Sequence, residues 1–309
     1  MEICAGAGGQ ALGLEQAGFE HEAAVELDAD ACETLRRNRG AAWKVVEDDV
    51  ANLDGHAFAG IDLLAGGVPC PPFSIAGRQL GHGDERDLFP QALRLIEESS
   101  PRAVMLENVR GLAAGRFDGY RAQVLGRLRE LRYQTWWELI QASDFGVPQL
   151  RPRLVLVAIR RPWAAAFCWP RPLPGSPPTV GEVLAGPMSQ AGWPGAAAWS
   201  CRAAGIAPTI VGGSKKHGGP DLGPTRARAA WRQLGVDGLG IADSPPGPGF
   251  PADGLPRLTT AMVALLQGFP ADWQFAGRKT AAYRQVGNAF PPPAARALAE
   301  AIAAALTAY

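Results

Sequence analysis

Cysteine is scarce in this chain of 309 residues. The five cysteines stand at positions 4, 32, 70, 168 and 201, and no two of them form a Cys-x-x-Cys pair. An odd number without paired spacing argues against both a disulfide framework and a zinc site. No apolar segment approaches the roughly 20 residues that cross a bilayer, and the first residues lack the pattern of a secretory signal. We therefore expect a cytoplasmic protein without a bound metal.

The chain has no net charge, because 30 basic and 30 acidic residues cancel. The charges are nevertheless unevenly distributed: residues 1–60 carry 4 basic and 12 acidic groups, whereas residues 121–235 carry 15 and 5. A basic middle third is typical of a protein that docks a polyanion on one part of its surface. Chance clustering of charges on solvated faces is the alternative interpretation.

Short apolar segments alternate with helical patterns through the first half of the chain. Strands are predicted at 2–5, 23–26, 61–67, 102–108 and 154–159, and helices at 11–17, 30–37, 90–98, 120–131 and 291–306. Apolar strands between helices are typical of a parallel, doubly wound α/β sheet. Prolines and glycines then dominate up to about residue 256, notably at 172–178 and 244–249, which predicts a smaller, loop-rich second domain.

A glycine-rich turn follows the first predicted strand. Residues 6–11 read Gly-x-Gly-x-x-Ala at the start of a helix, and Glu26 ends the next strand about 20 residues later. Glycines let the main chain approach a ligand closely, and an acid at that strand end binds ribose hydroxyls. The pattern fits a nicotinamide or flavin dinucleotide, or the adenosine of S-adenosylmethionine; an ordinary glycine turn is the alternative. Asp49, at another strand–loop junction, is placed to accept a hydrogen bond from an adenine amino group.

Reactive and charged side chains adjoin three of the predicted strands. Cys70 lies in a loop bounded by glycines and prolines, Glu107 ends strand 102–108, and Arg151 and Arg153 precede strand 154–159. Such a loop can hold a nucleophilic thiolate at the edge of the sheet, and a carboxyl group in a desolvated crevice can stay protonated. Two arginines at this spacing extend to the same side and suit phosphate or base recognition. Taken singly, a buried cysteine, an ion-paired or helix-capping glutamate and solvated arginines are the alternatives.

In their order along the chain, these segments resemble the DNA cytosine-5 methyltransferase family of the bacterial modification type. Six motifs carry the resemblance: Ala-Gly-x-Gly-Gly from Ala5, Pro69-Cys70, Glu107-Asn108-Val109, Gln149-x-Arg151-x-Arg153, Gln267-Gly-Phe-Pro and Gly287-Asn-Ala-x-Pro-Pro. The resemblance implies a class I S-adenosylmethionine-dependent methyltransferase sheet. It also implies a catalytic and cofactor-binding domain over 1–161, a target-recognition domain over 162–255, and a segment over 256–309 that returns to the catalytic domain.

The family mechanism assigns a role to each catalytic candidate. Cys70 attacks carbon 6 of a cytosine flipped out of duplex DNA, and carbon 5 then takes the methyl group of S-adenosylmethionine, leaving S-adenosylhomocysteine. Glu107 contacts the ring nitrogen and amino edge of the base. Arg153, with Arg151 nearby, orients the base or its phosphate.

The resemblance also implies two sets of binding residues. The cofactor set is Cys4, Ala5, Gly6, Gly8, Gly9, Glu26, Leu27, Asp49, Val50, Pro69, Leu88, Asn288 and Ala289. The DNA set is Ser74, Lys215, Lys216, Arg226, Arg228 and Arg257. The chain departs from the family pattern at Cys4, where phenylalanine is usual, at Pro71, where glutamine is frequent, and at Met262, where glutamate is common.

Double-stranded DNA is the expected partner, read by a monomer at the nucleoid, with a cognate restriction endonuclease in the same system. Three other functions compete with this interpretation. A nicotinamide-dependent oxidoreductase would explain the glycine turn but neither the Pro-Cys loop nor the basic middle third. The same catalytic frame could methylate RNA instead, and an inactive DNA-binding regulator could keep the fold without the chemistry.

Overall fold

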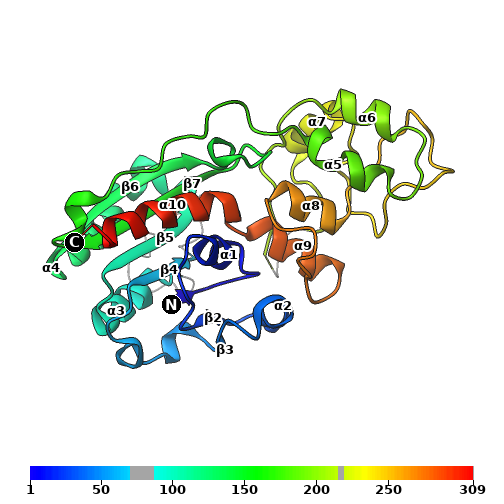
Figure 1. Cartoon of the computed structure of the whole chain (residues 1–309). Helices are drawn as coiled ribbons and strands as arrows, with labels where there is room; N and C mark the ends of the chain where they lie inside the picture. Colours follow the sequence, from blue (N-terminus) through cyan, green and yellow to red (C-terminus); the bar gives the residue numbers. More distant parts are fainter. Residues whose placement is uncertain (70–86, 215–218, 309) are drawn as a thin grey trace.

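The computed structural model describes residues 1–69, 87–214 and 219–308. Seven strands form one sheet in the order β3-β2-β1-β4-β5-β7-β6 (Figure 1). Their bounds are β1 Glu2–Ile3, β2 Ala24–Glu26, β3 Val45–Glu47, β4 Leu63–Gly67, β5 Ala103–Val109, β6 Tyr133–Gln141 and β7 Pro152–Arg160. The α/β class and the doubly wound order that the sequence predicts are confirmed.

The sheet is mixed rather than wholly parallel, which corrects the sequence prediction. Strands β1 to β5 run parallel, whereas β7 pairs antiparallel with both β5 and β6. The strand over 154–159 is found, but its direction is reversed because β6, which the sequence analysis missed, leads directly into it. Polar residues interrupt the apolar ones along β6, and most of its side chains are half-buried or exposed.

Ten α-helices accompany the strands in the described part of the chain. Their bounds are α1 Gly9–Gln16, α2 Ala29–Arg39, α3 Phe89–Ser99, α4 Asp118–Glu130, α5 Val180–Ser189, α6 Ala196–Arg202, α7 Thr225–Gln233, α8 Thr260–Leu266, α9 Lys279–Asn288 and α10 Pro292–Leu306. None of these described helices combines the length and apolar character that spanning a bilayer requires.

Two apolar cores cover the two faces of the sheet. Met105 of β5 faces a core that α1 and α10 close, whereas its neighbours Val104 and Leu106 face a core closed by α3 and α4. Alternate residues of a strand point to opposite faces, so one buried strand contributes to both cores. The residues of β5 from Ala103 to Leu106 are therefore all buried. Their packing fixes the position of the polar residues Glu107 and Asn108 that follow in the strand.

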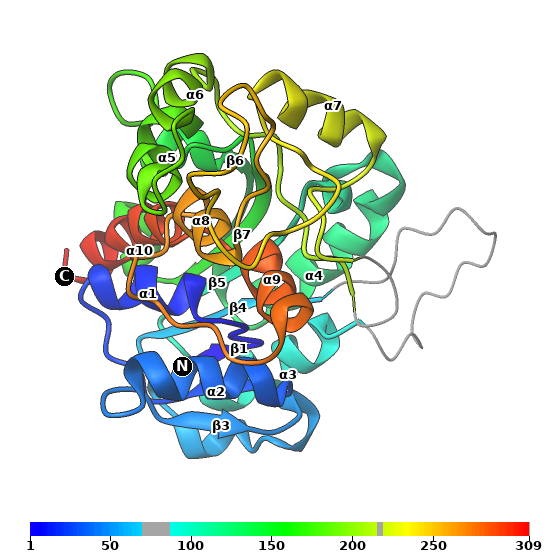
Figure 2. The same ribbon diagram turned by 90° about the vertical axis from the view of Figure 1, so that its right-hand side faces the viewer.

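A third core joins the second half of the chain to the first. Trp193, Trp199 and Trp231 pack there with residues of α5, α8 and α9, and the same cluster includes Leu12 of α1 and Leu35 of α2. In Figure 2, α5, α6 and α7 lie at the top of the molecule, and α8 and α9 lie between them and α2. The proline-rich stretch thus contains three helices that the sequence analysis did not predict.

A capping box marks the start of α5. The Thr179 hydroxyl accepts a hydrogen bond from the main-chain nitrogen of Glu182, and the Glu182 carboxylate accepts one from the Thr179 nitrogen. This Thr-x-x-Glu pattern is a recognised sign of a helix start. At α8, the sulfur of Met262 takes the position of the acid in the same arrangement, 3.5 Å from the Thr259 nitrogen. The departure at Met262 therefore leaves this helix capped.

Candidate active site

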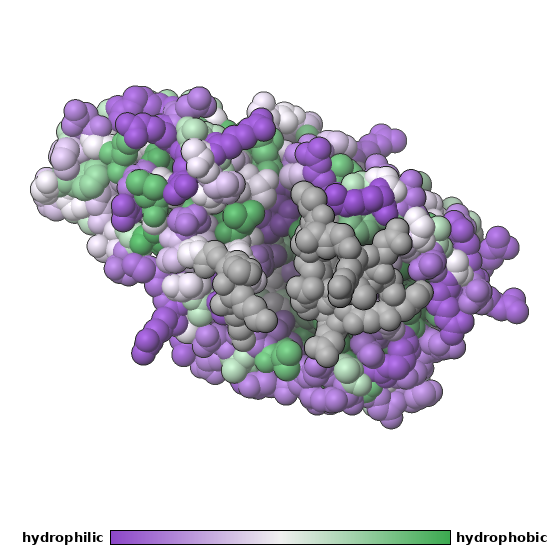
Figure 3. Space-filling model, turned by 180° about the vertical axis from the view of Figure 1, so that it is seen from behind, coloured by the Kyte–Doolittle hydropathy of each residue, from purple (hydrophilic) through white to green (hydrophobic). Residues whose placement is uncertain are grey.

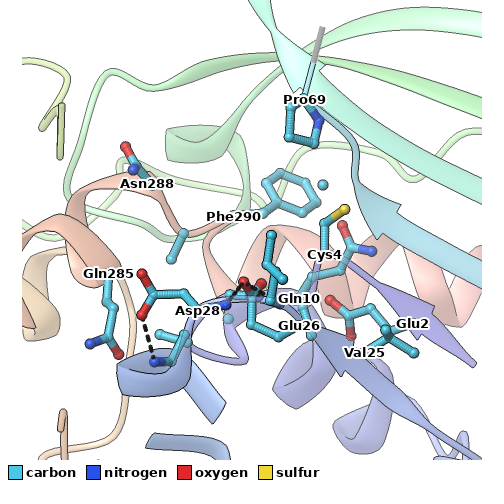
Figure 4. Close-up of a pocket in the computed structure, with 18 of the residues that line it drawn as sticks. Glu2, Cys4, Gln10, Val25, Glu26, Asp28, Pro69, Gln285, Asn288 and Phe290 are labelled. Carbon is cyan, nitrogen blue, oxygen red and sulfur yellow. Dashed lines mark hydrogen bonds between the residues drawn. The ribbon is translucent and has the colours of Figure 1, made fainter. Parts of the chain in front are cut away.

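A pocket of about 510 Å³ opens at the carboxyl ends of the parallel strands. Residues that end or follow β1, β2, β4 and β5 line it, namely Cys4, Glu26, Gly67 and Glu107. The strand order reverses between β1 and β4, and such a reversal leaves a crevice outside the strand ends of an open α/β sheet. Figure 4 shows the pocket between these strand ends and the end of α9.

Glu26 is held by main-chain nitrogens at the end of β2. Its carboxylate accepts hydrogen bonds from Gly6 at 2.8 Å, from Leu27 at 2.9 Å and from Asp28 at 2.8 Å. The bond from Gly6 ties the glycine turn after β1 to the end of β2. This carboxylate therefore has a fixed direction at the pocket wall, as a group that selects ribose hydroxyls needs.

Twelve of the thirteen residues predicted for the cofactor line this pocket. They are Cys4, Ala5, Gly6, Gly9, Glu26, Leu27, Asp49, Val50, Pro69, Leu88, Asn288 and Ala289. Gly8 does not line it: this residue precedes α1 with φ of 83°, and a Cβ there would lie 2.8 Å from the Leu35 side chain. Gly8 is thus needed for the turn and for its packing on α2.

Glu107 and Arg153 form a buried ion pair across β5 and β7. Their Oε1 and Nε atoms are 2.6 Å apart, and each side chain is 10% exposed. Burial raises the pKa of Glu107 above its ordinary value, although Arg153 and Arg151 oppose the shift. Glu107 also lines the pocket, so its carboxyl group faces the ligand space with an increased tendency to carry a proton.

Arg151, which the sequence analysis expected to act near Arg153 on the base, directs its guanidinium at main-chain oxygens. Its side chain is fully buried, and its guanidinium donates hydrogen bonds to the main-chain oxygens of Ile210, Gly287 and Ala289. The bonds to Gly287 and Ala289 are each 2.8 Å long. These bonds are those of a positioning residue: Arg151 connects the start of β7 to the main chain at Ile210 and to the pocket wall at 287–289.

Cys70 and Ser74 lie outside the described residues. The described residues on the two sides of this gap meet at the pocket. Pro69 and Leu88 both line the pocket, and the Leu88 nitrogen donates a hydrogen bond to the Pro69 oxygen at 3.2 Å. Asn108 donates a hydrogen bond to the Val68 oxygen at 2.7 Å. Asn108, next to Glu107 in the chain, thus fixes the main chain two residues before Cys70.

Cys4 is a second cysteine at the pocket, but its surroundings disfavour a thiolate. Burial raises the pKa of the Cys4 thiol, and the carboxylates of Glu26, Glu2 and Asp49 raise it further.

Phe290, which the sequence analysis did not single out, is the one aromatic residue among the described lining residues. In the view of Figure 4, its ring lies between Asn288 and Cys4.

The sequence analysis also missed several polar lining residues, among them Gln10 and Arg284. Gln10 is 4% exposed, and neither atom of its amide has a hydrogen-bond partner within the described residues. Arg284 lies on α9, one turn before Asn288. Gln10 stands inside the glycine motif and Arg284 four residues before Asn288, so closeness to a recognised motif was the available signal for both.

Comparison with known proteins identifies the family. The sequence model described as C-5 cytosine-specific DNA methylase matches residues 1–186 and 223–304. The chain belongs to this family. The predicted enzyme class, a DNA cytosine-5 methyltransferase, is thereby confirmed.

Individual relatives of the chain are similar over almost its whole length. It is 58% identical to the type II methyltransferase M.NaeI of Lentzea aerocolonigenes, over 99% of this chain and 75% of that protein. It is 50% identical to the type II methyltransferase M.NgoMIV of Neisseria gonorrhoeae, over 99% of this chain and 97% of that protein. The structure of Spodoptera frugiperda DNMT2 is similar in fold, with a TM-score of 0.67 at 17% identity and 98% coverage of both chains.

The residues that this DNA methylase was predicted to direct at DNA are less closely grouped than the cofactor set. Lys215 and Lys216 lie outside the described residues. Arg226 and Arg228 stand on α7, where Arg226 is exposed. Arg257 is also exposed, but its Nε lies 2.7 Å from an Asp237 oxygen. Trp193 and Trp199, considered as further candidates, belong to the third core instead.

Proposed function

We propose that this DNA methylase modifies carbon 5 of a cytosine within a specific duplex sequence, through a covalent bond to Cys70. The observation that carries the proposal is the convergence of twelve predicted cofactor residues and Glu107 on one pocket. Pro69, which precedes Cys70, lines the same pocket. A nucleophile, an acid and a methyl donor would therefore act at one edge of the sheet.

The lining residues fit S-adenosylmethionine. Glu26, fixed by three main-chain nitrogens, would hold the ribose hydroxyls, and Asp49 with Val50 would hold the adenine. The unpartnered amide of Gln10 indicates a polar ligand or water at the floor of the pocket, since buried amides are normally hydrogen-bonded. When bound there, S-adenosylmethionine would supply an electrophilic methyl group on its sulfonium sulfur.

The charge of the pocket favours this ligand over a nicotinamide dinucleotide. Six described lining residues carry carboxyl groups, including Glu26, Asp28, Asp48 and Asp49, and one carries a guanidinium. Carboxylates repel the pyrophosphate of a dinucleotide but attract the sulfonium and ammonium groups of S-adenosylmethionine. Phe290 offers an aromatic surface in the same pocket as Cys4, the position at which the family usually has phenylalanine.

The protein side chains would complete the chemistry on a flipped cytosine. The Cys70 thiolate adds to carbon 6, and the electron pair of the ring double bond makes carbon 5 nucleophilic. Glu107, kept protonated more readily by its burial, donates a hydrogen bond to the ring nitrogen, while Arg153 fixes its direction. After methylation, a base removes the proton from carbon 5 and the electron pair expels Cys70.

Target recognition would fall to the region between 162 and 255. The family match leaves residues 187–222 uncovered, inside this region, and the basic excess of the chain overlaps it. Ser74, Lys215, Lys216, Arg226, Arg228 and Arg257 remain the proposed DNA contacts. The relatives named as type II methyltransferases support a modification enzyme with a cognate restriction endonuclease in the same system. We propose that this enzyme acts as a monomer.

Labelled methyl transfer tests this function. The full chain is incubated with S-adenosylmethionine labelled in its methyl group, and with unmethylated DNA of mixed sequence or with transfer RNA. We expect label in 5-methylcytosine of the DNA, at one recurring sequence context, and none in the RNA.

Label in the RNA alone would support the RNA methyltransferase alternative. Binding of DNA with no label in either acceptor would support the inactive regulator. A parallel binding measurement with a nicotinamide dinucleotide should give no affinity, and affinity for it without affinity for S-adenosylmethionine would support the oxidoreductase.

A further inference from the structure

One guanidinium stands among the carboxyl groups of the pocket. Arg284 is the single lysine or arginine among its described lining residues, against six acids. S-adenosylmethionine has one anionic group, the carboxylate of its methionine part. We propose that Arg284 binds this carboxylate and so selects a methyl donor that carries an intact amino acid. The inference rests on the proposed function, because it takes this pocket as the cofactor site.

The hydrogen-bonding capacity of Arg284 is largely unused within the described residues. Its closest acid is Asp28, whose Oδ2 lies 3.7 Å from Nη2, beyond the length of a good hydrogen bond. A guanidinium presents five N–H donors in a rigid plane that matches both oxygens of a carboxylate. The side chain is 19% exposed, so a ligand in the pocket can reach it.

The main chain that carries Arg284 is closely held. A Cβ at Gly212 would lie 2.3 Å from the Arg284 oxygen, so the 212 segment packs directly on α9. At the next residue, the Gln285 amide oxygen accepts a hydrogen bond from the Thr34 hydroxyl of α2 at 2.6 Å. Holding the backbone in place lowers the ordering cost when a carboxylate binds.

Asp28 is unsuited to replace that carboxylate. Its Oδ1 already accepts hydrogen bonds from the main-chain nitrogens of Asp30 and Ala31, at 3.0 and 3.2 Å, at the start of α2. Its Oδ1 is thereby committed to capping the helix, and its Oδ2 lies 3.7 Å from the guanidinium. The guanidinium therefore retains donors for a second anion, while Asp28 stays near enough to limit its binding of unrelated anions.

The test compares ligands with and without the amino acid part. Isothermal titration calorimetry measures the binding of S-adenosylmethionine, S-adenosylhomocysteine and 5′-methylthioadenosine to the full chain without DNA. The variant is Arg284→Gln, and the matched control is Arg278→Gln, an exposed arginine that precedes the same helix outside the pocket. We expect Arg284→Gln to weaken the first two ligands roughly 10- to 100-fold, since hydrogen bonds to charged groups contribute on that scale.

5′-Methylthioadenosine should bind wild type and Arg284→Gln alike, because it has no carboxylate, and Arg278→Gln should match wild type for all three ligands. An equal loss of all three ligands in Arg284→Gln, or of none, would overturn the assignment. Unchanged cofactor binding with weakened binding of a DNA duplex would make Arg284 a phosphate ligand instead. If wild type bound none of the three ligands, the proposed cofactor site itself would fail.

Discussion

The first half of the chain brings polar groups from several strands to one pocket, whereas Arg226, Arg228 and Arg257, proposed for DNA in the second half, lie outside that pocket. Cys4, Glu26 and Glu107 come from the ends of three separate strands and line the same space, which Asn288 of α9 completes. In the second half Trp193, Trp199 and Trp231 pack in an apolar core, and Arg226 stays exposed on a helix. Catalysis requires groups that converge on the reacting atoms, whereas binding a long polyanion such as DNA requires charges spread over a surface.

The arrangement of Arg151 joins these two regions. Its guanidinium binds the Ile210 oxygen on one side and the Gly287 and Ala289 oxygens at the pocket wall on the other. Figure 3 shows a mainly hydrophilic face of the molecule, which contrasts with the wholly buried setting of this arginine. The comparison therefore predicts large effects on catalysis in the first half and graded effects on DNA affinity in the second.

The largest effect is expected at Cys70. Cys70→Ser keeps the size of the side chain but replaces the thiolate with a weaker nucleophile, so methyl transfer should fall at least about 10⁴-fold. Single-turnover transfer of labelled methyl measures the loss, and calorimetry with S-adenosylmethionine checks that binding is kept. Cys168→Ser, at an exposed cysteine outside the pocket, is the control and should retain turnover; transfer by Cys70→Ser at the wild-type rate would refute the mechanism.

The second-largest loss of activity is expected from substitution of Glu107. Glu107→Gln retains hydrogen bonds but cannot hold a mobile proton, and the loss in kcat/KM should be about 10²- to 10⁴-fold. Because burial raises the pKa of Glu107, its protonated form persists to higher pH than on an exposed glutamate, and activity that depends on this form falls as pH rises through that pKa. Rate–pH profiles of wild type and variant should differ in this falling limb, and identical profiles would exclude Glu107 as its origin.

A stability effect sharpens the comparison between the two halves. Trp199 is fully buried and donates a hydrogen bond to the Gly235 oxygen, so Trp199→Ala should lower the free energy of unfolding by about 3–5 kcal/mol. Since Trp199 shares its core with Leu12 and Leu35, urea unfolding followed by circular dichroism should show a single transition. Two separated transitions, with only one shifted by the substitution, would show that the halves unfold independently.

The smallest effect is expected at Arg226. If this exposed side chain contacts one phosphate, Arg226→Gln should reduce the slope of log K against log salt by about 0.9. Fluorescence anisotropy with a duplex at several salt concentrations measures the slope. Arg37→Gln, on α2 and paired with Glu33, is the matched control and should leave it unchanged. Equal slopes for both variants and wild type would remove α7 from the DNA surface.

The sequence predicts short motifs and buried strands well, and it predicts contacts between distant segments poorly. Buried strands such as β5 are apolar over several consecutive residues, here up to Leu106, and the predicted pocket residues lie in short motifs, so both could be predicted. The antiparallel direction of β7 depends on β6, whose mixed burial hides it. Arg151 and Arg153 share one motif but differ in role, because the carbonyl partners of Arg151 come from segments about 60 and 136 residues away. Such partners follow from tertiary packing, which spacing along the chain does not encode.

Covalent trapping tests the central claim most directly. A duplex of the methylated sequence carries 5-fluorocytosine at the target position, where fluorine replaces the hydrogen that must leave as a proton. With S-adenosylmethionine present, the account predicts a protein–DNA adduct that survives denaturation and maps by mass spectrometry to the peptide containing Cys70. Cys168→Ser should form the same adduct and Cys70→Ser none. Methylation of unmodified DNA by an enzyme that forms no adduct, or an adduct at another residue, would contradict the account.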